Sequence, residues 1–300
     1  MGWKWDHLNK DDKLLLVERN VARDKNLFRT PADISDPQVG MLHNYEVCTE
    51  VVTWQWPGDD RVFLIPIELF DHAKFGGLTR DIISFLGQLF RDSRYPENMM
   101  VTASLRQIAG GIGLSWNGGR VGEQIEKVLA FARCLTVNNY QIIEELNKNY
   151  TVKKERRETF GFVDRVSRIA IDNSMPVPRN KQKYEIYLSR LYSYALRNLP
   201  PAPLPAKALE VAHSAPWRIQ GAVKNIAYYL AGRVPQNEVR LLLPTAREIC
   251  GFAERSDGKV ARTQKSIEHV LSVLSPTMIS DYQYDTAGYN ILLSGKTTKK

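Results

Sequence analysis

Cysteine is scarce in this chain of 300 residues, which contains only Cys48, Cys134 and Cys250. Three widely spaced cysteines cannot all pair with one another, and two of them lie within apolar helical patterns. The sequence therefore favours buried thiols in a reducing cytosol over a disulfide framework.

Long hydrophobic runs are also missing. No apolar run approaches the roughly 18 residues that a membrane-spanning helix needs. The first twenty residues carry charges throughout and lack the apolar core of a signal peptide. We therefore expect a cytoplasmic protein without a membrane partner.

Catalytic signatures are absent as well. The five histidines are isolated and form neither a His-x-His pair nor a metal-ligand cluster. The segment Ser294–Thr297 resembles the end of a phosphate loop, but Asn290 stands where the first glycine would be, and no helix follows. The glycines at 110–113 lack the preceding strand of a dinucleotide site. The sequence predicts no catalytic residue, no metal and no cofactor, so an enzyme, including a DNA-nicking one, is the less favoured alternative.

Positive charge is what the chain has in excess. Lys and Arg number 41 against 33 Asp and Glu, which gives a formal net charge of +8. Residues 148–190 alone hold eleven Lys or Arg against five Asp or Glu. This concentration favours an anionic partner, of which nucleic acid is the most common.

One pattern occurs twice, beginning near Thr102 and again near Leu243. In each copy a short helix and a turn precede a long amphipathic helix, predicted over 119–134 and 257–274, and strands follow. A helix-turn-helix with a trailing hairpin is typical of winged-helix domains, which insert the second helix into the major groove of DNA. The apolar stripes of the two long helices are Val121, Ile125, Val128, Leu129 and Ala132 in the first, and Val260, Ile267, Val270, Leu271 and Leu274 in the second.

The predicted fold class is α+β, with two tandem winged-helix domains that are rich in helix and carry small β-hairpin wings. We expect the wing of the first domain over 135–143 and 158–171, with a charged tip at 147–157. Trp54 and Trp56 share one face of a strand in the N-terminal region, which favours packing over ligand stacking. The predicted domains are an N-terminal β-containing extension with a hairpin at 1–74, a first winged-helix domain at 75–172, a linker at 173–183, a second winged-helix domain at 184–295 and a basic tail at 296–300.

A helix that enters a groove needs long cationic or amide side chains on its outer face, because these reach phosphates and base edges. The predicted DNA contacts are Arg120, Gln124 and Lys127 on the first long helix; Lys153, Lys154, Arg156 and Arg157 at the wing tip; and Arg255, Lys259, Arg262, Gln264 and Lys265 on the second long helix.

The order of elements resembles the bacterial plasmid replication initiator (Rep) proteins. The resemblance lies in ASLRQIAGGIGLSWNGG and IEKVLAFARCLTV within 103–137, YLSRLYSYALRNLP at 187–200 and KSIEHVLSVLSPTMISDYQYD at 265–285, and spans about 75–295. It implies sequence-specific binding of double-stranded DNA at origin repeats (iterons) and melting of the adjacent duplex. It also implies partnership with the host replication initiator and replicative helicase, and a homodimer. A winged-helix transcriptional regulator or a phage replication protein remains the alternative.

Overall fold

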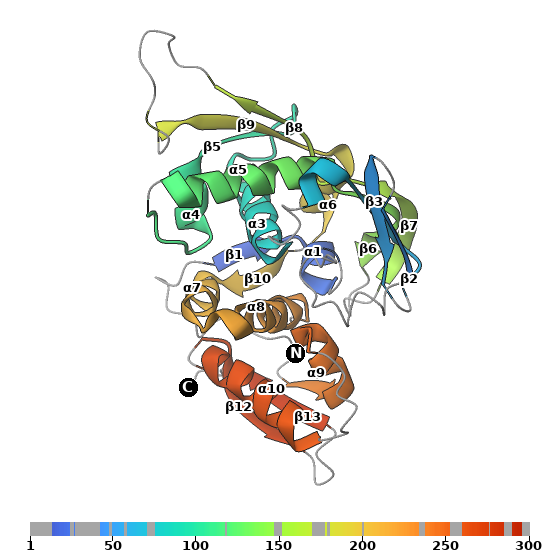
Figure 1. The fold of residues 1–300 in the computed structure, drawn as a ribbon, viewed down its shortest axis with the longest axis vertical. Coiled ribbons are helices and arrows are strands. Elements are labelled where there is room, and N and C mark those ends of the chain that lie inside the picture. The colour runs from blue at the N-terminus through green and yellow to red at the C-terminus, as the bar shows by residue number, and fades with distance from the viewer. Residues whose placement is uncertain are drawn as a thin grey trace. The chain divides into compact units, whose positions relative to one another are not determined.

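The computed structural model of the chain forms two compact units. The central unit spans 26–201, and the terminal unit combines 1–25 with 202–300. Each unit can be followed by residue colour in Figure 1. The residues that the structure describes are 14–24, 27, 43–47, 50–56, 59–70, 76–117, 119–146, 152–169, 178, 181–199, 201–233, 238–252, 260–275, 277–284 and 290–295.

The central unit combines helices with two antiparallel sheets. Its elements are β2 (His43–Val47), β3 (Val51–Gln55), β4 (Val62–Pro66), α3 (Gly76–Asp92), β5 (Met100–Ser104), α4 (Leu105–Gly111), α5 (Gly119–Cys134), β6 (Thr136–Leu146), β7 (Val152–Phe160), β8 (Val163–Arg168), β9 (Lys183–Leu188) and α6 (Arg190–Asn198).

The smaller sheet of this unit has the strand order β5-β9-β8. β9 is its middle strand, with Ile186 opposite Val101 of β5 on one side and Val166 of β8 on the other. Figure 1 shows α3, α4 and α5 on one side of this sheet. Leaving the insertion β6–β7 aside, the chain order is α3-β5-α4-α5-β8-β9, with the last strand hydrogen-bonded to the first.

The two helices between β5 and the next strands form where the sequence predicts them. Ser104 caps α4, because its side chain accepts a hydrogen bond from the Gln107 N–H at 3.1 Å. The apolar stripe of α5 is buried as predicted, and its residues Ile125, Val128 and Ala132 are fully shielded from solvent. The 3.6-residue period of apolar residues therefore predicted correctly both the position of this helix and the face that it buries.

The larger sheet, β2-β3-β4-β6-β7, corrects the predicted wing. The predicted hairpin of β3 and β4 is present, and both Trp54 and Trp56 are buried, with Trp54 stacked on Phe63 at a ring-centroid distance of 5.5 Å. β6 pairs with β4 as well as β7, so the strand pair that we predicted as the wing belongs to this sheet. The predicted second wing strand, 158–171, is divided between β7 and β8, which join different sheets.

The terminal unit repeats the same order of elements. It contains β1 (Leu14–Val17), α1 (Arg19–Arg23), β10 (Ala202–Pro205), α7 (Ala206–Ser214), α8 (Trp217–Gly232), β11 (Glu238–Leu242), α9 (Leu243–Cys250), α10 (Val260–Leu274), β12 (Ile279–Tyr284) and β13 (Asn290–Gly295). Its three-stranded sheet has the order β11-β13-β12. In the series α8-β11-α9-α10-β12-β13 the last strand, β13, is therefore again hydrogen-bonded to the first strand, β11. The predicted stripe residues Ile267, Val270, Leu271 and Leu274 of α10 are buried.

The division between the units differs from the predicted linker at 173–183. β9 begins at Lys183 and pairs with both β5 and β8, and the units divide after Pro201. Of the predicted linker, 173–177 and 179–180 lie outside the described residues, as does the basic tail at 296–300. The predicted extension at 1–74 is also divided, because β1 pairs with β10 in the terminal unit, with Val17 opposite Ala202.

The middle position of β9 gives a stability prediction. Ile186 is fully buried, so Ile186→Ala should lower the free energy of unfolding by about 2–5 kcal/mol through lost burial and the cavity left behind. The neighbouring change Glu185→Ala, on a partly exposed side chain, should cost no more than about 0.5 kcal/mol. Urea unfolding of the whole chain measures both. An equal cost for the two variants would contradict the placement of β9.

Candidate nucleic-acid interface

The outer face of α5 carries the first predicted group of DNA contacts. Arg120, Gln124 and Lys127 follow one another at helical spacing, opposite the buried stripe. Arg120 is exposed and has no ion pair or hydrogen bond within the described part of the chain. Lys127 pairs with Glu123, one turn earlier, at 2.9 Å between Nζ and Oε1. Such exposed pairs are weak, so Lys127 can exchange Glu123 for a phosphate at little cost.

The short helix α4 adds a cation that the sequence analysis missed. Leu105, Ile108 and Ala109 are buried, which leaves the side chains of Arg106 and Gln107 exposed on the other face. The signal was present in the sequence, since two long polar residues lie between apolar ones.

The four basic residues of β7 do not form a free positive stripe. Lys153 pairs with Glu145 on the neighbouring strand at 2.9 Å, and Arg156 pairs with Glu158 at 3.0 Å. Lys154 also has an interaction partner. Carboxylates that face cations across and along the strands therefore offset much of the charge that we had assigned to DNA.

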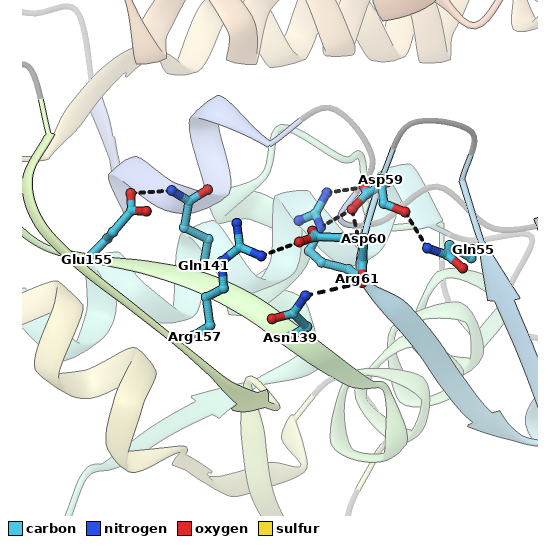
Figure 2. A network of polar contacts seen from close by, with 8 residues as sticks. All are labelled: Gln55, Asp59, Asp60, Arg61, Asn139, Gln141, Glu155 and Arg157. Carbon is cyan, nitrogen blue, oxygen red and sulfur yellow. Dashed lines mark hydrogen bonds and ion pairs between the residues drawn. The ribbon is translucent and has the colours of Figure 1, made fainter.

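Arg157 belongs to a polar network that joins three parts of the larger sheet (Figure 2). Its guanidinium pairs with the carboxylate of Asp60, which comes from the turn between β3 and β4. Asn139 of β6 donates to the backbone carbonyl of Asp60 at 3.2 Å, and Gln141 of β6 donates to Glu155 of β7. Figure 2 shows Asp60 beside Asp59 and Arg61, with the Arg157 guanidinium directed toward its carboxylate, so Arg157 has a structural partner in this sheet.

The hairpin of β8 and β9 carries three basic residues that are not among the predicted contacts. Arg165, Arg168 and Lys183 are all exposed. The Arg165 guanidinium lies over the ring of Tyr187 at 3.9 Å, which holds it on the surface of the sheet. β8 packs against α5, so this hairpin flanks the helix that presents Arg120. Within 148–190 the exposed positive charge is therefore less neutralised in β8 and β9 than in β7.

The second predicted group lies on and before α10. Lys265 is exposed and has no ion pair within the described residues. Gln264 is half-buried, and its backbone carbonyl accepts a hydrogen bond from the Tyr284 hydroxyl at 3.3 Å. Arg255 and Lys259 lie outside the described residues, and so does the side chain of Arg262.

Two other features are absent from the described residues. No group of three or more His, Cys, Asp or Glu side chains gathers in a way that could hold a metal ion. In the same part of the chain, no helix has the length and apolar character needed to cross a bilayer.

The arrangement of elements matches a solved structure. A crystal structure of a selenomethionine derivative of domains 2 and 3 of RctB aligns with a TM-score of 0.50 and 9% identity, over 92% of this chain and all of that one. This chain shares its fold with those domains. A second crystal structure of RctB domains 2–3 aligns at a TM-score of 0.40 and 9% identity over 79% of this chain and 87% of its own, and at that score it adds nothing to the first. No protein-family model and no curated protein sequence matches the chain.

The Lys153–Glu145 pair gives a pH prediction. The hydrogen bond and the charge of Lys153 lower the pKa of Glu145 below its ordinary value of 4.5. The Glu145 carboxyl therefore binds a proton less tightly in the folded state than in the unfolded state. The stability that the ion pair contributes to the fold is complete above the pKa that Glu145 has in the unfolded chain, and it is lost as the pH falls through the pKa of Glu145 in the folded chain. An NMR titration of the Glu145 carboxyl should show this depression, and Lys153→Met should largely remove it.

The matched control for that titration is Lys154→Met. Lys154 has only a minor electrostatic effect on Glu145, so its loss should leave the pKa of Glu145 nearly where it is in the unchanged chain. Equal shifts in the two variants would show that general charge, and not the hydrogen bond, sets the pKa.

Proposed function

We propose that this chain binds double-stranded DNA through the outer faces of α5 and α10 and acts in the initiation of replication at an origin. The observation that carries the proposal is the repeated arrangement of two helices between the first strand and the last two strands of a three-stranded sheet. In a winged helix two helices are likewise followed by a hairpin, and the second helix enters the major groove, so this arrangement supports the proposal. The hairpins β8–β9 and β12–β13 would then be the wings.

The distribution of charge also supports an orientation in which the outer faces of α5 and α10 contact DNA. Each of the two helices buries its apolar stripe and presents an exposed cation, Arg120 on α5 and Lys265 on α10. Arg106 and the β8–β9 hairpin extend the basic surface around α5. Arginine can form paired hydrogen bonds with guanine, while lysine contacts phosphates as a point charge.

Two likenesses support a role in replication. Segments of the sequence resemble plasmid Rep proteins, and the fold is shared with domains of RctB, which is a bacterial replication initiator. The finer parts of the proposal are binding to direct repeats beside an AT-rich tract, melting of that tract, recruitment of the host initiator and helicase, and a homodimeric state. A promoter palindrome as the preferred site would instead favour a transcriptional regulator, which uses the same interface.

The deciding experiment is footprinting on the DNA that flanks the gene. Protection of clustered direct repeats is the expected outcome, whereas protection of a single palindrome, or of no sequence, would contradict the initiator function. Incubation with supercoiled DNA and Mg²⁺ is expected to leave it uncut. Metal-dependent strand cleavage would show that the protein is a nicking enzyme.

Arg120→Ala tests the role of α5. If Arg120 reads a base, the variant should lose about 1–3 kcal/mol of binding free energy on the preferred site, measured by fluorescence anisotropy with a labelled duplex. Arg133→Ala is the matched control, because Arg133 is exposed in the last turn of the same helix but on a different face. Equal losses in both variants would indicate that only net charge matters.

A second pair of variants tests which hairpin lies on the DNA backbone. Replacing both Arg165 and Arg168 by Gln should weaken binding to all sequences and reduce the slope of log K against log salt by about 2, since each phosphate contact contributes about 0.9. Replacing Lys153 and Arg157 by Gln removes the same charge, but from residues with carboxylate partners. We expect a smaller change in slope, and the reverse order would assign the contact to β7.

A further inference from the structure

A groove in the central unit has no part in the proposed DNA contacts of α5. It is lined by residues of α6, of β7 and of the segment between α3 and β5, and its volume is about 1000 Å³. Pockets of this size accommodate ligands as large as a nucleotide. The residues that carry the inference are Arg156, Glu158, Arg190, Leu191, Ser193 and Arg197.

The first turn of α6 leaves two hydrogen-bond donors at this groove. The Ser189 N–H donates to the carbonyl of Phe162, and the Ser189 hydroxyl accepts from the Tyr192 N–H at 3.2 Å. The N–H groups of Arg190 and Leu191 have no acceptor within the described residues, and both residues line the groove. Free N–H groups at the start of a helix are natural donors to an anion.

Ser193 provides an independent observation that points to a ligand. This residue lines the groove, is only 2% exposed, and its hydroxyl has no hydrogen-bond partner within the described residues. A buried hydroxyl without a partner is destabilising, so native structures rarely keep one. Ser193 lies one helical turn after Arg190, on the same side of α6. A bound anion at the first turn would therefore give this hydroxyl an acceptor.

The arginines of the groove have different partners. Arg190 is exposed and has no carboxylate partner within the described residues. Arg156 pairs with Glu158 at 3.0 Å, so much of its charge is already offset. Arg197 donates to the backbone carbonyls of the segment between α3 and β5, at 3.3 and 3.0 Å. Arg190 is thus the cation available to a ligand, while Arg197 fixes the backbone of the segment between α3 and β5, which forms one wall of the groove.

That wall has an unusual backbone. Arg94, Tyr95 and Met99 all adopt left-handed conformations, with φ of 57°, 58° and 56°, although none is glycine. Such residues persist only where the surrounding structure enforces them, and they gather at functional sites. Arg197 supplies part of that enforcement, because it binds the Tyr95 carbonyl, and Met99 lines the groove.

We propose that this groove binds a phosphate group. Its oxygens accept hydrogen bonds from the N–H groups of Arg190 and Leu191, from the Arg190 guanidinium and from the Ser193 hydroxyl. The phosphate belongs either to a DNA backbone or to a free nucleotide, since both present the same oxygens. The binding does not require α5 or α10 to read DNA.

The test uses the whole chain and two probes. ATP without magnesium, measured by calorimetry, represents the free nucleotide, and a labelled random-sequence duplex, measured by anisotropy, represents the backbone. The variants are Arg190→Ala and Ser193→Ala. The control is Lys207→Ala, which removes one exposed positive charge from α7 in the other unit. Thermal unfolding of Ser193→Ala should match or exceed that of the unchanged chain, because the variant removes a hydroxyl that lacks a partner.

We expect at least one probe to bind, and both groove variants to weaken it about ten-fold or more, as loss of a charge-assisted hydrogen bond does. Lys207→Ala should change it by less than about two-fold. An effect on ATP identifies a nucleotide site, and an effect on the duplex alone identifies a backbone site. Binding of neither probe, wild-type binding by the groove variants, or an equal loss with Lys207→Ala would overturn the proposal. Duplex binding that falls with Arg120→Ala but not with Arg190→Ala, together with no binding of ATP, would overturn it while leaving the proposed function intact.

Discussion

Hydrogen bonding between the first and the last strand of each three-stranded sheet is the constraint on which the rest of the structure depends. In the central unit β5 and β9 are far apart in sequence, and their pairing places Val101 opposite Ile186 in the buried core. The helices α4 and α5 leave β5 and must pack against the sheet that this pairing closes, which directs Arg106 and Arg120 outward. In the terminal unit β11 and β13 impose the same constraint on α9 and α10.

The helices could be predicted from the sequence because their signal is local. The period of apolar residues in 119–134 and the capping serine at 104 need no knowledge of distant residues. Strand partners are a different matter, because β5 pairs with β9 and β4 pairs with β6 across long separations in the sequence. The prolines and polar residues around Pro178 indicate a turn, and the same composition serves a linker between domains or the end of a hairpin. For that reason the wing and the domain boundary could not be placed from the sequence.

The number of basic residues could be predicted from the sequence, but not which of them are left without a carboxylate partner and so can bind DNA. The sequence shows the basic residues of β7, but it does not show that Asp60, almost a hundred residues earlier, reaches Arg157, or that Glu145 faces Lys153. These pairs form because neighbouring antiparallel strands bring distant positions together. The same reasoning explains why the groove beside α6 escaped notice. Its residues come from three separate segments, and neither the Ser193 hydroxyl nor the N–H groups of Arg190 and Leu191 are distinctive in the sequence.

The pairing of β1 with β10 has a consequence for synthesis on the ribosome. Leu14–Val17 is translated early, yet its partner begins at Ala202, after the whole central unit. The nascent chain must therefore carry this strand without its partner, with Leu15 and Val17, both buried in the finished structure, unable to reach their final environment. The terminal unit can therefore form only after the residues of the central unit have been translated. Fragments that begin at Ala202 would lack this strand permanently, so expression of the segment 202–300 alone should include residues 1–25 in trans or by permutation.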